Sequence, residues 1–297
     1  MMRPLTMYRS LVSFILLLAM AGSALKAQAP STSKVTETLQ SVFGGWRKAM
    51  TEKDLALWQK STAKFRQIGI RNMIVSQKNK WPESLFEGPV KPPNLSSMKM
   101  AKIMINGPTA QLVYFGKADF GIGEDVKSPK GLLFLMFIKE SNDWKFSTSR
   151  FMNLSNAEEI STAAQLGDFS FLDSPQFKPP GKVPPMPKLC PLPEMVGYLE
   201  IVSIGYETKV SVAERSKHMV INNVHKGLII GGLKKGINPI FVETRPLNKK
   251  KGQDSKTHFE INVYRQTDQE RKPLKLIYGS GAKKDPGNFR IIVRGNG

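Results

Sequence analysis

The sequence predicts two successive domains, an α+β domain of three helices on a four-stranded antiparallel sheet and then an all-β sandwich. At 297 residues the chain is long enough to bury two cores. Apolar residues recur at helical spacing before residue 80 and alternate at strand spacing after residue 97. Helices followed by antiparallel strands are typical of an α+β domain. Beyond residue 193 the helical period disappears, which favours an all-β second domain.

Residues 1–29 have the layout of a signal peptide. Basic Arg3 and Arg9 precede an apolar run, residues 11–20, and small residues follow. The run is too short to span a bilayer, so we expect no transmembrane span. Cleavage after Ala24 or Ala29 would release an exported protein into the periplasm or the extracellular space.

Three helices are expected in the first domain. Residues 35–50 carry an apolar stripe at helical spacing: Leu39, Val42, Phe43, Trp46 and Met50. Thr51 can cap a second helix that contains Leu55, Leu57 and Trp58. A third helix is predicted from about residue 63 to residue 78, and Trp81-Pro82 ends it.

Four strands in two hairpins follow the helices. Residues 97–105 and 109–117 flank Asn106-Gly107-Pro108, and residues 131–140 and 143–152 flank Ser141-Asn142-Asp143. With Trp46 in the first helix, NGPTA before a strand and NDWKF opening the last strand, residues 33–153 resemble the nuclear transport factor two-like superfamily, which includes ketosteroid isomerases and SnoaL-type cyclases. The resemblance implies a cone-shaped domain in residues 30–155, with a curved sheet wrapped over helices and often enclosing a pocket.

A linker and a β-rich region complete the chain. Residues 156–193 are expected to link the two domains: residues 156–167 look like a short helix, and residues 175–193 are rich in proline, as in a semi-rigid spacer. Residues 194–297 contain short alternating segments separated by Gly, Asn, Lys and Pro, which predicts a sandwich of seven or eight strands. The stretch GGLKKGINPIFV resembles the turn-to-strand segment of immunoglobulin-like or jelly-roll domains.

Histidine and cysteine chemistry has little support in the sequence. The histidines are His218, His225 and His258, at spacings that match no zinc or facial-triad pattern. The single cysteine, Cys190, lies in the spacer and is expected to be a free thiol. Nucleotide-binding and nucleophile-elbow motifs are not found. We therefore expect no metal, no cofactor and no catalytic residues.

Tyr114 and Arg150 are the candidate ligand-binding residues. Strict alternation along the last strand of the first domain places five residues on one buried face: Trp144, Phe146, Thr148, Arg150 and Met152. A buried guanidinium needs a partner, so Arg150 either pairs with an acid, reaches water, or grips an anionic ligand. Tyr114 either is a core tyrosine or offers its hydroxyl to the same cavity.

The formal net charge of +20 limits the kinds of partner that the protein can bind. The excess is spread evenly over both domains and the only tight run is Lys249-Lys250-Lys251, which argues against nucleic acid. The leading hypothesis is an exported, non-catalytic binding or scaffold protein that meets an anionic envelope polymer or a partner protein. Two alternatives stay open: a small-molecule lyase or isomerase that uses the cone, and a carbohydrate-binding module whose platform residues are Tyr198, Tyr206, Tyr264 and Tyr278. A homodimer through the α+β domain is also left open.

Overall fold

The computed structural model describes residues 32–88, 91–120, 129–247, 257–271, 273–283 and 286–295. The predicted signal peptide and the lysine run at 249–251 lie outside the described residues. None of the described helices is long and apolar enough to cross a membrane.

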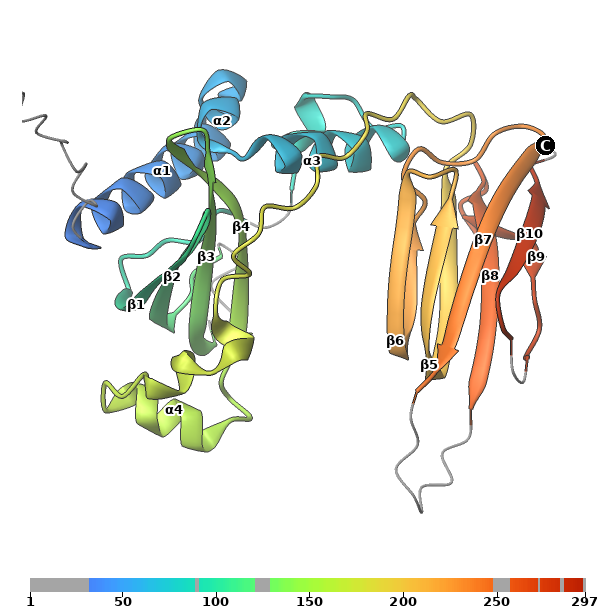
Figure 1. The fold of residues 1–297 in the computed structure, drawn as a ribbon. Helices are drawn as coiled ribbons and strands as arrows, with labels where there is room; N and C mark the ends of the chain where they lie inside the picture. The colour runs from blue at the N-terminus through green and yellow to red at the C-terminus, as the bar shows by residue number, and fades with distance from the viewer. Residues whose placement is uncertain are drawn as a thin grey trace, which may run out of the picture.

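The described chain is mostly β, with two antiparallel sheets (Figure 1). The four α-helices are α1 (Thr32–Glu52), α2 (Leu55–Ser61), α3 (Lys64–Ser76) and α4 (Glu158–Gln165), with short 3₁₀ helices η1 (Glu83–Leu85), η2 (Ser170–Asp173) and η3 (Pro175–Phe177). The first sheet has the order β1-β2-β3-β4 and contains β1 (Met98–Asn106), β2 (Thr109–Lys117), β3 (Lys130–Glu140) and β4 (Asp143–Asn153). The second contains β5 (Gly197–Val212), β6 (Ser216–Leu228), β7 (Ile237–Pro246), β8 (His258–Gln266), β9 (Leu274–Gly279) and β10 (Phe289–Arg294).

The first sheet is covered on both faces. The two predicted hairpins are confirmed, with Asn106 opposite Thr109 and Glu140 opposite Asp143. On one face the apolar stripe of α1 packs against β2, β3 and β4. On the other face, α4 and the 3₁₀ helices bring Phe177 onto Phe134, with ring centroids 5.9 Å apart. Because both faces are covered, β2 and β3 are buried along nearly their whole length, as their continuous apolar sequence requires.

The prediction of three helices packed on a curved sheet is wrong. Of the first three helices, α1 lies along the sheet, and the chain just after α2 meets β4, where Ala63 N–H donates to Phe146 O at 2.8 Å. Helix α3 instead runs toward the second sheet (Figure 1). Ile70 and Ile74 of α3 join a separate cluster with the end of α1, α2 and η1, built around Ala49, Trp58, Ile74 and Leu85. Two polar side chains of α3, Arg71 and Asn72, donate to backbone carbonyls of the spacer, at Cys190 and Lys188.

The prediction of a sandwich of seven or eight strands is also wrong. Six strands form one hydrogen-bonded sheet. Two segments predicted as separate strands, residues 198–204 and 206–214, both belong to β5, and residues 218–224 together with the start of the predicted segment 227–232 belong to β6. Gly205 and Asn222 both have positive φ, and Gly205 N–H donates to Asn222 Oδ1 at 2.9 Å. These residues bend the β5–β6 ribbon without interrupting it.

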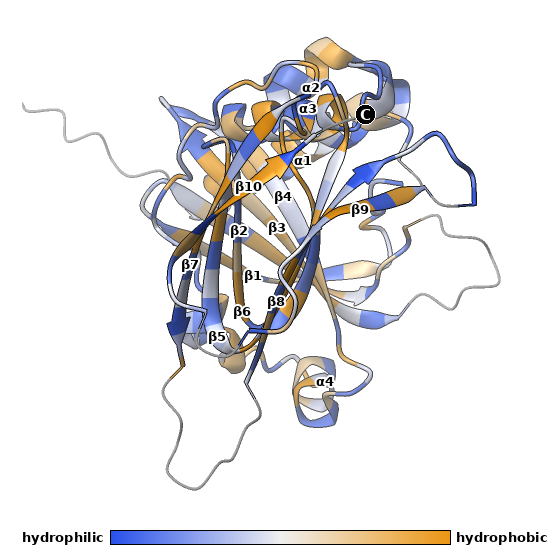
Figure 2. Cartoon of the chain, turned by 90° about the vertical axis from the view of Figure 1, so that its right-hand side faces the viewer, coloured by the Kyte–Doolittle hydropathy of each residue, from blue (hydrophilic) through white to orange (hydrophobic). Residues whose placement is uncertain are grey.

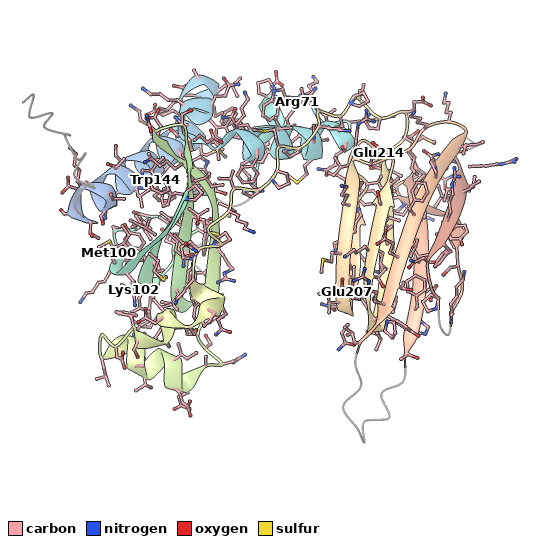
Figure 3. All side chains as sticks on the ribbon, viewed as in Figure 1. Arg71, Met100, Lys102, Trp144, Glu207 and Glu214 are labelled. Carbon is pink, nitrogen blue, oxygen red and sulfur yellow. The ribbon has the colours of Figure 1, made fainter. Side chains whose placement is uncertain are left out.

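The bend folds the ribbon back on itself. Ile230, just after β6, donates its N–H to Ser216 Oγ at the start of β6 at 3.0 Å, so the two ends of β6 meet. In Figure 3, Glu214 lies at the end of the sheet nearest α3 and Glu207 at the opposite end. One edge of β5 pairs with β8 through residues 197–204 and with β7 through residues 206–212. The sheet therefore encloses a single core, in which Phe259 of β8 contacts Phe289 of β10 with centroids 5.9 Å apart.

Helix α3 fastens the spacer and the second sheet to the first part of the chain. The buried Asn72 amide donates Nδ2–H to Lys188 O at 2.8 Å, and its Oδ1 accepts from Cys190 N–H at 3.0 Å. Ser76 Oγ, also buried, accepts from Gly231 N–H at 2.7 Å. Cys190 is a buried free thiol beside these groups. This set of contacts, here called the α3 junction, comprises Asn72, Ser76, Lys188, Cys190 and Gly231.

Replacing Asn72 tests the junction. In Asn72→Ala the backbone groups of Lys188 and Cys190 lose their partner while the site stays buried, so the free energy of unfolding should fall by about 1–3 kcal/mol. Urea unfolding followed by circular dichroism measures the change. Asn79→Ala removes an exposed amide just beyond the same helix and should change the free energy by less than about 0.5 kcal/mol. Equal effects of the two substitutions would contradict the junction.

Candidate functional site

Tyr114 and Arg150 lie on opposite faces of the first sheet. Tyr114 is buried on the α1 face, where its hydroxyl accepts a hydrogen bond from Gln40 Nε2 at 3.0 Å. Burial raises the pKa of the Tyr114 hydroxyl, which Gln40 partly offsets. Arg150 is exposed on the other face, with its guanidinium carbon 4.8 Å from the centre of the Phe134 ring. The two candidates therefore do not meet in one site.

A β-bulge in β4 explains why strict alternation failed there. Phe137 of β3 pairs with Phe146, but Met136 pairs with Thr148, so Ser147 is an extra residue. Beyond the bulge, the faces exchange. Trp144 and Phe146 pack in the α1-side core, whereas Met152 packs in the opposite core beside Arg150's partner Phe134. Arg150 reaches solvent, one of the alternatives left open by the sequence.

His218 and His225 form a hydrogen-bonded pair across the bend of β6. His218 Nδ1 lies 3.1 Å from His225 Nε2, and His218 Nε2 lies 2.8 Å from Ser216 Oγ. Since Ser216 Oγ already accepts from Ile230 N–H, its hydroxyl hydrogen is free to donate to His218. Burial, and then the charge of His225, lowers the pKa of His218 to about 4. Among the described residues no three His, Cys, Asp or Glu side chains are grouped to hold a metal ion.

The outer face of β6, β5, β7 and β10 gathers exposed cations around exposed apolar side chains. Figure 2, seen from the side of the second sheet, shows hydrophilic and hydrophobic residues interspersed on this sheet. The cations are Lys209, Lys217, Arg245, Arg290 and Arg294, all exposed. The apolar members are Met219, Phe241 and Ile292, which are 60%, 49% and 53% exposed. This surface, with Glu207 and Glu243 as its acids, is called the basic face below.

Cross-strand pairing sets the geometry of the basic face. Phe241 of β7 lies opposite Arg290 of β10 on one side and opposite Ser211 of β5 on the other. The Arg290 guanidinium stacks over Phe241, 5.4 Å from the ring centre. Lys217 of β6 lies opposite Ser211. Arg290, Phe241, Ser211 and Lys217 thus form a row across β10, β7, β5 and β6, with a cation at each end. Next to this row, a depression of about 400 Å³ is lined in part by Lys209, Lys217, Met219 and Phe241.

The acids neutralise this surface only in part. Glu207 pairs with Lys209 at 3.5 Å, and Glu243 lies opposite the same lysine. Lys217, Arg245 and Arg294 make no ion pair with a described residue. The basic face can therefore attract an anion, while Phe241 and Met219 offer apolar contact.

In comparisons of sequence and structure, no protein family, curated protein or solved structure matches this chain. The resemblance of residues 33–153 to the nuclear transport factor two-like superfamily thus stays a prediction.

Sequence reasoning missed the basic face, although the signal was present. Alternation along NPIFVETR places Phe241, Glu243 and Arg245 on one side of a strand, and alternation along NFRIIVRG does the same for Arg290, Ile292 and Arg294. The charge was instead judged by its distribution along the chain. Only the pairing of β7 with β10 brings the two sets onto one surface.

The lowered pKa of His218 predicts a loss of stability in mild acid. The unfolded chain takes up a proton near pH 6.5, whereas folded His218 stays neutral until about pH 4. Protons therefore bind preferentially to the unfolded state, and the free energy of unfolding should fall as pH drops from 6.5 to 4. Urea unfolding at a series of pH values measures this slope.

In His218→Gln part of that slope should vanish. The matched control is His258→Gln, which removes a partly exposed histidine lying 3.6 Å from Glu260 and should leave the His218 contribution in place. The account fails if the slope between pH 6.5 and 4 is the same in His218→Gln and in the unmodified protein.

Proposed function

We propose that the chain is an exported, non-catalytic binding protein that holds an anionic envelope polymer on the basic face of its second sheet. The observation that carries the proposal is the row of Arg290, Phe241 and Lys217 across adjacent strands, flanked by further exposed cations. A sheet face with repeated positive charge suits an extended polymer that carries repeated negative charge. The leading hypothesis from the sequence thus acquires a specific surface.

The rest of the chain supports a scaffold role in this proposal. The first sheet has apolar side chains packed on both faces, and the α3 junction ties it to the second sheet through buried hydrogen bonds. The first part of the chain would then position the basic face relative to another envelope component or a partner protein. Export rests on the predicted signal peptide.

The lyase or isomerase alternative gains no support from the two candidate residues. A reacting centre would need Tyr114 and Arg150 to face one ligand, and they are separated by the sheet. On the α1 face, Leu112, Leu133 and Leu135 fill the space around Tyr114 and are fully buried.

One specific observation supports the carbohydrate-binding alternative. Tyr198 and Tyr264 lie opposite each other on β5 and β8, beside a depression of about 450 Å³ that both line. Tyr264 Oη donates to Glu200 Oε2 at 2.8 Å, and Lys226 pairs with the other oxygen at 2.8 Å. These bonds, first that from Lys226, lower the pKa of Glu200. The other two platform candidates are not available, because Tyr206 is buried and Tyr278 packs against the core.

A polymer-binding assay distinguishes these functions. Dextran sulfate, an anionic polymer, should bind the protein with an affinity that falls steeply as salt is raised, whereas uncharged dextran should not bind. The triple variant Lys209→Glu/Lys217→Glu/Arg290→Glu should lose at least about tenfold in affinity, because each change removes an attraction and adds a repulsion. Biolayer interferometry with immobilised polymer measures both.

The matched control reverses the same number of positive charges outside the basic face. Lys53→Glu/Lys99→Glu/Lys139→Glu alters three exposed lysines of the first part of the chain and should keep most of the affinity. Equal losses in the two triple variants would show non-specific attraction by net charge and refute the basic face. Binding of uncharged dextran that Tyr198→Ala abolishes would favour the carbohydrate module instead.

A further inference from the structure

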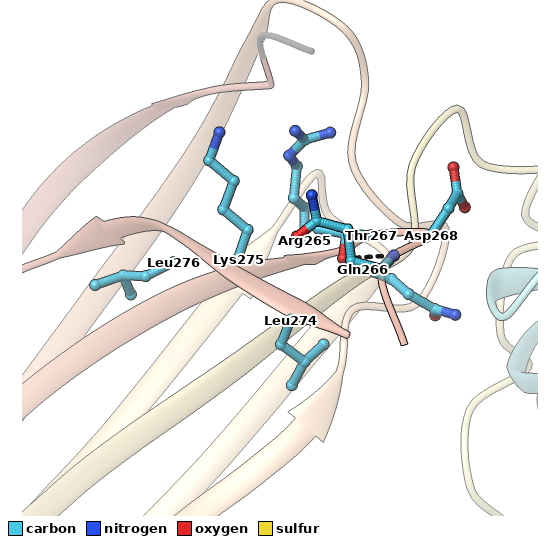
Figure 4. A pocket seen from close by; sticks show the side chains of 8 residues that line it. Arg265, Gln266, Thr267, Asp268, Leu274, Lys275 and Leu276 are labelled. Atoms are coloured by element: carbon cyan, nitrogen blue, oxygen red, sulfur yellow. Dashed lines mark hydrogen bonds between the residues drawn. The ribbon is translucent and has the colours of Figure 1, made fainter. Parts of the chain in front are cut away.

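Two cations lie directly opposite each other at the end of the second sheet, on strands that do not belong to the basic face. Arg265, near the end of β8, pairs in register with Lys275 of β9. Figure 4 shows their side chains extending side by side in the same direction. Like charges at such a position repel and destabilise a sheet. From this pair we infer a binding site for a single oxyanion, a carboxylate or a phosphate group, between Arg265 and Lys275.

The hydrogen bonding of Arg265 is incomplete without a ligand. Its Nε is buried and has no hydrogen-bond partner. A buried donor left unpaired is costly, and guanidinium groups are normally satisfied by a carboxylate, phosphate or carbonyl oxygen. Because Nε itself is closed to solvent, an oxyanion would accept from the outer Nη donors of Arg265, and Lys275 would add a second positive charge.

The chain provides no internal anion for the pair among the described residues. Neither Arg265 nor Lys275 takes part in an ion pair. The nearby acid, Asp268, points away from both cations in Figure 4. The positive charge at this position is therefore left for a molecule from outside.

The surroundings fit a small anionic group. A depression of about 660 Å³ surrounds the pair, and its lining includes Gln266, Thr267 and Gln269 together with the acid Asp268. Backbone bonds fix this loop, since Thr267 N–H donates to Pro273 O at 2.9 Å and Gln266 N–H to Val196 O at 2.9 Å. The site thus combines two cations with mostly neutral side chains, which suits an oxyanion.

This site does not depend on the proposed polymer binding. The basic face lies on β6, β5, β7 and β10, whereas Arg265 and Lys275 belong to β8 and β9. A free small anion and an acidic group of a larger molecule offer the same oxyanion. Small probe ions test the site itself.

Thermal unfolding in different anions tests the inference. Midpoints are measured for the full chain in chloride, inorganic phosphate and succinate at equal ionic strength, and phosphate or succinate should raise the midpoint of the unmodified protein above its value in chloride. Phosphate also stabilises proteins by exclusion from their surface, so the comparison is between variants in the same buffer. In Arg265→Gln the anion-dependent rise should be lost, and Arg265→Lys, which keeps the charge without the fork, should retain only part of it.

Lys275→Glu gives a second, independent readout. The new carboxylate would occupy the position of the ligand beside Arg265, so the midpoint in chloride should rise and the response to phosphate and succinate should disappear. A response to phosphate alone assigns a phosphate-type ligand, and a response to succinate alone assigns a carboxylate-type ligand. Equal anion responses in Lys275→Glu and the unmodified protein would refute the site, even if Arg265→Gln fails to fold.

The control on the basic face separates the two proposals. Lys217→Gln should keep the full anion response, because Lys217 lies on another set of strands. If Lys217→Gln loses the response while Arg265→Gln keeps it, the small anion binds the basic face and the Arg265–Lys275 site is wrong. If the basic-face variant loses polymer binding but keeps its response to phosphate and succinate, the result supports a small-anion site on β8 and β9.

Discussion

The arrangement of the chain depends on one buried amide, that of Asn72. A helix in this position has to hold an irregular, proline-rich segment whose backbone groups cannot pair with each other, and Asn72 supplies both a donor and an acceptor to that backbone. Ser76, one turn further on, bonds the loop that follows β6. Any movement of the second sheet away from α3 would leave these buried groups unpaired, which is costly in free energy.

This constraint explains why α3 is not a sheet-packing helix. Ile70 and Ile74 of α3 pack in the small cluster with Trp58 and Leu85, while Asn72 and Ser76 require polar partners. The sequence shows the polar residues, but a helical pattern alone does not say which element will meet them. The same limit applies to the spacer, whose proline content predicts stiffness and not the helix on which it lies.

Local features of the chain were predictable and long-range ones were not. The four strands of the first sheet and both of its hairpin turns follow from alternation and turn residues, and the structure has them within a residue or two of the expected bounds. The extra Ser147 in β4 leaves almost no mark in the pattern of apolar residues, and Gly205 reads as a break between two strands although it is a bend within one. Each changes which side chains share a face, so Arg150 was assigned to the wrong face and two long strands were divided. The basic face and the Arg265–Lys275 pair arise from strand pairing, which the order of residues does not reveal.

The folded-back β5 strand has a consequence for cooperativity. Its first half is held by β8 and its second half by β7, while β6 runs along the other edge of both. Neither half of the sheet can separate from the rest without exposing backbone groups and core side chains of the strand that both halves share. The two halves should consequently open together as a single foldon, with the amide protons of β5 among the last to exchange with solvent.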